Sequence, residues 1–295
     1  MYNKTIIVLF VILITTYIVQ SDRGMITIKS DAKVFNPIQR AIIAWDGKKE
    51  YLILSSDLYS SEKTSAIEVI PFKKKPEIKS VDEKVFSDMF FLVNREMFLN
   101  NILSRSNRQR GVVRKDVEVI FKKLIGEHNI SIFKVRKQKE FVLYLNEYIK
   151  KNFPDHIKED LDQGFIDMVD QYLKKGFRYF VLDIIDLSKE VVSKKSMQYT
   201  FQSEELYYPL KISSLNNGTT EIELTVITKG LLHYFPEMKV SNIMLIHRPI
   251  DIAVKKFKEI SEDIYMMFKE HKEVRVRLWN LGGENSQLKK DIIAK

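Results

Sequence analysis

The segment from Ala41 to Phe72 constrains the fold of this chain more than any other, because it combines continuous apolar runs with turn chemistry. The runs Ala41–Trp45 and Tyr51–Leu54 flank Asp46-Gly47, a pair that tolerates the positive φ of a tight hairpin turn. Apolar residues at nearly every position predict a hairpin whose two faces are both covered, by helices or a second sheet. A third strand is expected to end at Ile70-Pro71, since proline cannot donate to a strand ladder.

The pair Trp45-Asp46 lies at the tip of this predicted hairpin. An aromatic ring beside a carboxylate is a layout found in carbohydrate contacts. Trp45, however, follows four apolar residues in register, so we expect it to be a core anchor rather than a ligand platform.

The spacing of apolar residues predicts the helices and strands between positions 81 and 187. Helical spacing is expected over 81–103, and a strand-helix-helix-strand unit over 130–135, 140–151, 157–173 and 177–187, with Gly176 as a C-cap. A sheet packed against helices is the arrangement that such a unit requires.

The C-terminal half carries a second turn signal. Asn216-Asn217-Gly218 lies between 207–212 and 220–226, which predicts a second hairpin with Ile222, Leu224 and Val226 facing inward. A helix over 252–269 and a strand over 274–279 complete the chain. The fold class is therefore α+β, with antiparallel or mixed sheets packed with helices. We expect a hairpin-rich part over 22–125 and an α+β part over 126–295, packed together as one unit.

The first 21 residues read as a separate segment. A short positive start is followed by the apolar run 6–19 and then by a polar stretch, which is the pattern of a secretory signal peptide. Fourteen apolar residues fall short of the roughly 20 that span a bilayer comfortably, but an uncleaved membrane anchor stays open as the alternative. The protein is therefore expected to be exported, and either extracellular or attached to the cell membrane through this segment.

The formal net charge is +9, which attracts anionic partners in general. One dense cationic cluster falls within 104–115, and nucleic acid is an unlikely partner because the cluster lacks interleaved aromatic residues for base stacking. An exposed loop or helix end is the preferred interpretation, with contact to an anionic surface as the alternative for Arg105, Arg108, Arg110, Arg114 and Lys115.

Several landmarks together resemble a known family. They are AIIAWDGKKEYLIL, the strand end Ile70-Pro71-Phe72, the segment KKGFRYFVLDI, the strand start Tyr208-Pro209-Leu210 and the tail RVRLWNLGGENSQLKKDI. This set resembles the family known as domain of unknown function 2330, found in exported bacterial and archaeal proteins. Lysines displace the second proline of the family's Pro-x-Pro pattern to Pro76. The resemblance implies an envelope or extracellular protein and brings no activity with it.

Catalytic motifs are not visible in the sequence. Cysteine is absent, which excludes disulfides and thiolate metal sites, and the five histidines have no metal-ligand spacing. Asp183 and Asp186 lie three apart on a predicted strand and so point to opposite faces, which favours solvation at a strand end over a shared site. Asn217 matches a glycosylation acceptor at a turn tip. No metal or cofactor is expected.

These observations favour a non-enzymatic envelope protein with a structural or binding role, and with an envelope protein or a polysaccharide as its partner. Two alternatives stay open. One is an extracytoplasmic hydrolase whose residues gather only in three dimensions, which a pocket with convergent carboxylates or histidines would favour. The other is a binder of anionic polymers that uses the cluster within 104–115.

Overall fold

The fold is that of a computed structural model, which describes residues 24–28, 32–35, 39–55, 58–103, 128–153, 160–189, 195–216, 218–232, 243–245 and 248–295. Four α-helices and a larger number of strands in antiparallel and mixed sheets form these parts, so the predicted α+β class is confirmed. The apolar run 6–19 lies outside the described residues. Within the described residues, no helix is both long and apolar enough to cross a membrane.

The larger sheet has the strand order β13-β15-β12-β3-β4-β10-β7, with β14 also paired to β15. Most neighbours are antiparallel, but β12 runs parallel to β3. The bounds of its strands are β3 (Gln39–Trp45), β4 (Lys49–Leu54), β7 (Glu77–Val81), β10 (Ser196–Gln202), β12 (Thr219–Thr228), β13 (Ile243–Leu245), β14 (Ile250–Ala253) and β15 (Glu273–Glu284).

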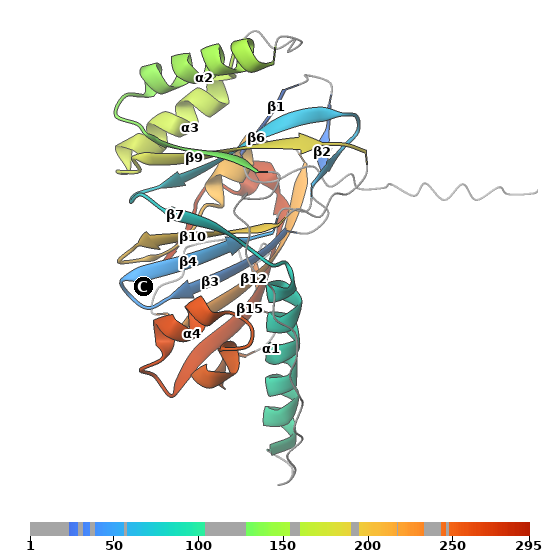
Figure 1. Cartoon of the computed structure of the whole chain (residues 1–295), viewed down its shortest axis with the longest axis vertical. Helices are drawn as coiled ribbons and strands as arrows, with labels where there is room; N and C mark the ends of the chain where they lie inside the picture. Colours follow the sequence, from blue (N-terminus) through green and yellow to red (C-terminus); the bar gives the residue numbers. More distant parts are fainter. Residues whose placement is uncertain are drawn as a thin grey trace, which may run out of the picture.

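A second sheet has the order β1-β6-β9-β8, and two short pairs join β11 to β16 and β2 to β5. Figure 1 shows this sheet above the larger one, with α2 and α3 beyond it and α4 below the larger sheet. The bounds are β1 (Met25–Thr27), β2 (Val34–Phe35), β5 (Tyr59–Ser60), β6 (Thr64–Phe72), β8 (Asn129–Lys134), β9 (Tyr179–Leu187), β11 (Leu206–Tyr208) and β16 (Ile292–Ala294).

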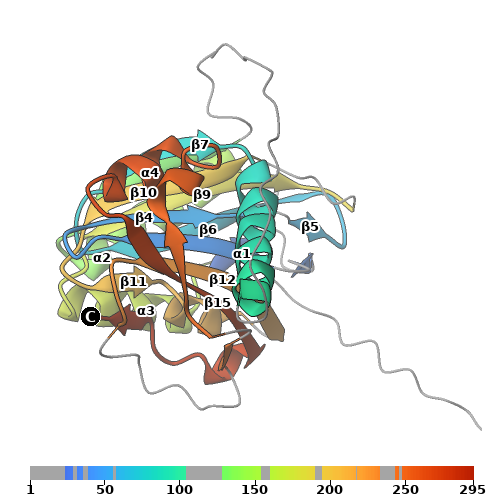
Figure 2. The same ribbon diagram turned by 90° about the horizontal axis from the view of Figure 1, so that it is seen from below.

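The helices cover the outer faces of these layers. Seen from below in Figure 2, α1 and α4 lie on the same side of the larger sheet. The helix bounds are α1 (Lys84–Leu103), α2 (Gln138–Asn152), α3 (Gln163–Lys174) and α4 (Glu262–Phe268), with the 3₁₀ turns η1 (Lys211–Leu215), η3 (Val254–Phe257) and η4 (Asn285–Gln287).

The first hairpin and its two covered faces are confirmed. β3 pairs with β4 across Asp46-Gly47, and Gly47 has a φ of 92°. Alternate side chains enter different cores: Ile43 and Leu52 join the core between the sheets, while Ile42 and Ile53 join the core under α1 and α4. The continuous apolar runs thus arise because both faces of this sheet are packed.

The strand predicted to end at Ile70-Pro71 continues through Pro71 to Phe72. Pro71 is opposite Phe180 of β9. On the other side of β6, β1 pairs only with Ala66–Glu68 and does not reach Pro71. Proline is tolerated here because its neighbour on one side has already ended.

The second predicted hairpin is wrong. β11 is only three residues long and pairs with β16, and η1 follows directly after Pro209-Leu210. β12 pairs instead with β15 and β3. The Asn216–Gly218 turn signal marks the start of β12, but tertiary pairing decides its partners. Thr225 alternates with the inward-facing Leu224 and Val226, and it is buried as well because this sheet is covered on both faces.

The predicted helix over 252–269 is also wrong in extent. Ile250–Ala253 forms β14 against β15, η3 follows, and α4 begins only after Ser261, whose Oγ accepts a hydrogen bond from the Ile264 N–H at 3.4 Å. The apolar period of this segment is real, since Val254, Phe257, Ile264 and Phe268 are all buried. Pairing with β15 converts its start into a strand.

The strand-helix-helix-strand unit is confirmed as β8, α2, α3 and β9, with β8 and β9 adjacent and antiparallel. α3 ends at a C-cap in which Gly176 has a φ of 84°. The Phe177 N–H then donates to the Tyr172 oxygen at 3.0 Å, which turns the chain into β9 as a glycine C-cap does.

Candidate functional site

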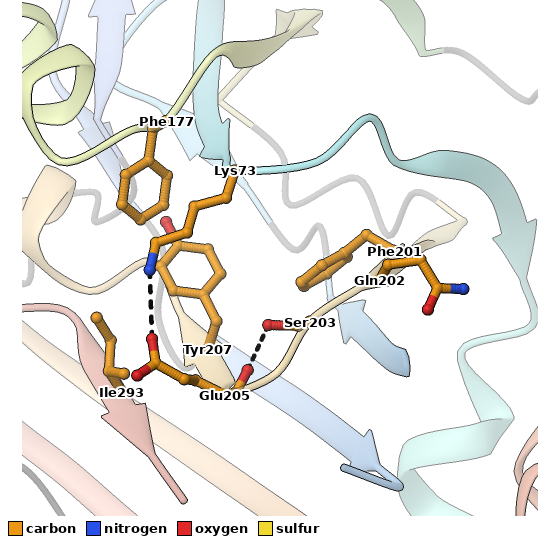
Figure 3. Close-up of a pocket in the computed structure, with 8 residues that line it drawn as sticks. All are labelled: Lys73, Phe177, Phe201, Gln202, Ser203, Glu205, Tyr207 and Ile293. Atoms are coloured by element: carbon orange, nitrogen blue, oxygen red, sulfur yellow. Dashed lines mark hydrogen bonds and ion pairs between the residues drawn. The ribbon is translucent and has the colours of Figure 1, made fainter. Parts of the chain in front are cut away.

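A surface pocket lies where the ends of several strands meet. Lys73 follows β6, Phe177 precedes β9, and Phe201 and Gln202 end β10. The remaining lining residues come from the β10–β11 turn and from the paired strands β11 and β16: Ser203, Glu205, Tyr207 and Ile293. Figure 3 shows these side chains arranged around the opening. The pocket encloses about 280 Å³ of empty space, including the part open to solvent.

Aromatic rings form the walls of this pocket, which we call the aromatic pocket. The ring centroids of Phe177 and Tyr207 lie 5.3 Å apart, and those of Phe201 and Tyr207 lie 6.3 Å apart in an edge-to-face arrangement. Phe72 packs behind them, 5.0 Å from Phe201. Each of these rings is at least nine-tenths buried. Such packing fixes the rings in position and leaves an apolar surface toward the opening.

Charged groups lie at the mouth of the aromatic pocket. Lys73 Nζ lies 3.2 Å from Glu205 Oε2, and Lys295 Nζ lies 3.2 Å from Glu205 Oε1. Lys73 Nζ is also 5.6 Å from the centroid of the Phe177 ring. Partial burial raises the pKa of the Glu205 carboxyl, but hydrogen bonds from Lys295 and Lys73 outweigh it, so the net pKa is lowered. Glu205 therefore stays ionised and holds two ammonium groups beside the opening.

The base of the aromatic pocket is tied to the first hairpin. Trp45 Nε1 donates to the Ser203 oxygen at 3.0 Å, and the Ser203 N–H donates to the Lys48 oxygen at 2.8 Å. Trp45 is half-buried against the core between the sheets rather than fully enclosed. Its indole thus fixes the turn that carries Ser203.

Glu50 is a buried carboxyl beneath this turn. Its Oε2 accepts a hydrogen bond from the Tyr207 N–H at 2.8 Å, and its Oε1 has no hydrogen-bond partner among the described residues. Burial raises the pKa of Glu50 well above its ordinary value, although the bond from Tyr207 opposes this. The side chain is 0% exposed, so Glu50 lies behind the pocket wall and does not reach the opening.

A second cavity adjoins the aromatic pocket at Phe201 and Gln202, which line both. It is a groove across β4, β10 and β7 that ends at α4. It is larger and more polar than the aromatic pocket, and encloses about 960 Å³ of empty space including the part open to solvent.

The sites predicted from sequence lie elsewhere or outside the described residues. Asn217 and the cations Arg105, Arg108, Arg110, Arg114 and Lys115 all fall outside them, as does the N-terminal segment 1–21. Within the described ranges, no group of three or more histidine, aspartate or glutamate side chains is placed to hold a metal ion.

The solvated position expected for Asp183 is wrong. Asp183 is 1% exposed, near the middle of β9, and its Oδ2 makes a close contact with His128 Nδ1. His128 Nε2 lies 3.0 Å from the Lys195 oxygen. Burial alone would lower the pKa of His128, but the hydrogen bond and charge of Asp183, with the charge of Glu68, raise it overall. Asp186, by contrast, is exposed and accepts a hydrogen bond from Ser65 Oγ at 2.6 Å, so the expectation of opposite faces is confirmed.

No sequence motif marks the residues of the aromatic pocket. They are spread from Lys73 to Ile293, with no fixed spacing that marks a motif. The alternation of Met197, Tyr199 and Phe201 along β10 was an available signal for an apolar strand face. It does not show that the last ring borders a cavity.

The profile of the bacterial family described as "Uncharacterized protein conserved in bacteria (DUF2330)" matches residues 19–233. This chain belongs to the DUF2330 family. The resemblance carried by the hairpin, KKGFRYFVLDI and Tyr208-Pro209-Leu210 is thereby confirmed. In this DUF2330 protein the match includes every lining residue of the aromatic pocket except Ile293.

Comparison with solved structures gives distant similarities to this DUF2330 protein. The crystal structure of baculovirus P35 is 11% identical, covering 90% of this chain and 97% of that chain with a TM-score of 0.43. A mutated baculovirus P35 after caspase cleavage is 10% identical, covering 87% and 99% with a TM-score of 0.39. Scores this low support no functional statement. No curated protein matches the sequence.

Proposed function

We propose that this DUF2330 protein is an exported or membrane-anchored protein of the cell envelope with a non-enzymatic binding role. In this proposal the aromatic pocket receives one apolar side chain of a partner protein. The observation that carries it is the set of three fixed rings, Phe177, Phe201 and Tyr207, around a cavity that opens to the surface. The positive start and apolar run 6–19 support export.

The chemistry of the pocket favours an apolar occupant. Transfer of an apolar side chain from water onto ring surfaces is favourable by about 25 cal/mol per Å² of area buried. The mouth does not oppose entry, because the Lys73 side chain is 47% exposed and can turn toward solvent. Glu205 keeps its second partner, Lys295, when Lys73 moves. The buried position of Glu50 supports a structural rather than a catalytic assignment for this carboxyl.

Trp45 provides a natural probe of occupancy, because its indole is bonded to Ser203 of the lining. The chain has two tryptophans, so Trp279→Phe leaves Trp45 as the single emitter. Titration of this protein with N-acetyl-leucinamide is expected to change Trp45 fluorescence saturably, while N-acetyl-glycinamide, which lacks a side chain, does not.

A pocket-filling variant tests whether this signal comes from the aromatic pocket. Ile293→Phe is expected to abolish the response, because the larger side chain occupies the cavity. Ile260→Phe is the matched control, since Ile260 is a half-buried residue packed against the core under α1 and α4, and does not line the aromatic pocket. Equal loss in both variants, or no response in the parent, contradicts the binding proposal.

Export is tested separately from binding. Fractionation of the native cells is expected to place the protein in the envelope or outside the cell, and mass spectrometry of its N-terminus distinguishes a cleaved signal from an anchor. A mature start at Asp22 indicates cleavage. Recovery in the soluble cytoplasmic pool with Met1 retained contradicts the export proposal.

A further inference from the structure

The groove beside the aromatic pocket is built from one face of three neighbouring strands. The register pairs Gln202 with Lys49, and places Thr200 between Tyr51 and Glu77. Because side chains alternate along a strand, these residues share a face, opposite the one that Tyr199 and Phe201 present to the core between the sheets. Here the packed sheet gives way to a polar open surface, which we call the sheet-face groove.

The neutral polar side chains of the sheet-face groove use some of their hydrogen-bonding atoms within the protein and leave others available to a ligand. Gln198 Nε2 donates to Asp263 Oδ2 at 2.8 Å and lies 3.4 Å from Thr200 Oγ1. Gln198 Oε1 has no hydrogen-bond partner among the described residues although Gln198 is 1% exposed. A buried amide oxygen without a partner is costly, and a ligand hydroxyl would satisfy it. Thr200 Oγ1 accepts from Gln198 and so keeps its O–H to donate.

Charges in the sheet-face groove are unevenly matched. Lys79 forms a close ion pair with Asp263 at the α4 end. Lys49 and Lys75 also line the groove, and neither forms a salt bridge with any residue that the structure describes. Lys49 Nζ instead lies 5.0 Å from the centroid of the Tyr51 ring. Two ammonium groups therefore stand beside amide and hydroxyl groups, with Glu77 as the carboxylate nearby on the same face.

We propose that the sheet-face groove binds an acidic saccharide, whose hydroxyls bond to Gln198, Thr200 and Gln202 and whose acidic groups pair with Lys49 and Lys75. A neutral sugar would leave both ammonium groups without a salt-bridge partner in the groove, where Asp263 already pairs with Lys79. An acidic peptide would also pair with them, but its backbone N–H groups are the donors that it offers to Gln198 Oε1, in place of the many hydroxyls of a saccharide. A tetraglutamate peptide is therefore the competing ligand to test. The sheet-face groove is distinct from the aromatic pocket in its ligand, so this inference stands independently of the function proposed above.

Three probes separate these cases: tetragalacturonate, maltotetraose and a tetraglutamate peptide. Isothermal titration of the full-length protein is expected to show tetragalacturonate binding, with weaker or undetectable binding of maltotetraose and tetraglutamate. Equal binding of tetraglutamate and tetragalacturonate overturns the proposal, because charge alone then accounts for recognition. Failure of tetragalacturonate to bind overturns it as well.

Variants locate the binding on the molecule. Lys75→Gln and Thr200→Val are each expected to weaken tetragalacturonate binding by about threefold to tenfold, the loss of one hydrogen bond or ion contact. Lys74→Gln is the matched control, since Lys74 is an exposed neighbour that does not line the groove. Circular dichroism checks that Thr200→Val is folded. If Lys75→Gln and Lys74→Gln behave alike, the saccharide binds elsewhere and the proposal fails. The response of Trp45 to N-acetyl-leucinamide stays unchanged in these variants, which keeps the two sites distinguishable.

Discussion

The substitution Asp291→Asn is expected to stabilise this protein at neutral pH. Asp291 lies just before β16, and its Oδ1 accepts hydrogen bonds from Tyr172 Oη and from the Lys211 N–H, both at 2.9 Å. Burial raises the pKa of Asp291 to about 6 from 3.8, although these bonds and the charges of Lys175 and Lys211 oppose the rise. Asparagine keeps an acceptor oxygen in place of the carboxylate and removes the buried charge.

The magnitude follows from linkage between protonation and folding. Because the folded pKa lies above the unfolded one, the contribution of Asp291 to stability is full below the unfolded pKa and is lost as pH rises through the folded pKa. The difference of about two pKa units corresponds to about 3 kcal/mol at pH 8. Roughly 1.4 kcal/mol of this loss falls between pH 5 and pH 8. The advantage of Asp291→Asn is therefore expected to grow by that amount over this interval.

Urea unfolding followed by circular dichroism at pH 5, 6.5 and 8 measures this difference. Asp170→Asn is the control, because Asp170 is 45% exposed and pairs with Lys174 on α3. An exposed pair of this kind contributes about 0–1 kcal/mol. If the difference between Asp291→Asn and the parent is constant from pH 5 to 8, or shrinks as pH rises, the assignment of a buried charge at Asp291 is refuted.

Two further substitutions test the packing of the fold. His128→Ala is expected to lower the free energy of unfolding by about 3–5 kcal/mol, because it leaves Asp183 buried without its partner. Since the folded pKa of His128 is raised, the stabilisation by this pair is full below about pH 6.5, the unfolded value, and is lost as pH rises through the folded pKa. Urea unfolding at pH 6 and pH 9 should therefore show the larger loss at pH 6. Gly176→Ala is expected to cost about 1–2 kcal/mol because of its positive φ, whereas Gly230→Ala, at a site with equal space and no positive φ, should change thermal unfolding little.

Local signals in the sequence predict the parts of the fold that local chemistry decides. The β3–β4 hairpin follows from Asp46-Gly47 and its apolar runs, and the end of α3 follows from Gly176, because each needs only neighbouring residues. The partners of β12 are different: its pairing with β3 and β15 joins segments far apart in the chain. A turn signal at Asn216–Gly218 contains no information about such partners.

Sequence patterns could not predict the candidate sites either, because their residues are also far apart in the chain. The aromatic pocket brings together residues from Lys73 to Ile293, and the sheet-face groove needs the register of β4, β10 and β7. His128 and Asp183 lie 55 positions apart and meet only because β8 pairs with β9. Composition and spacing predict that such residues exist, whereas the strand order decides which of them touch.

Intermolecular nuclear Overhauser effects give the most direct test of the proposed binding role. The measurement uses the protein with labelled aromatic rings and an Ile293 methyl label, in the presence of N-acetyl-leucinamide. The account predicts contacts from the leucine methyls of the probe to Phe177, Phe201, Tyr207 and Ile293, and their loss in Ile293→Phe. Contacts that fall on other residues, such as Ile260, or that persist unchanged in Ile293→Phe, would contradict it.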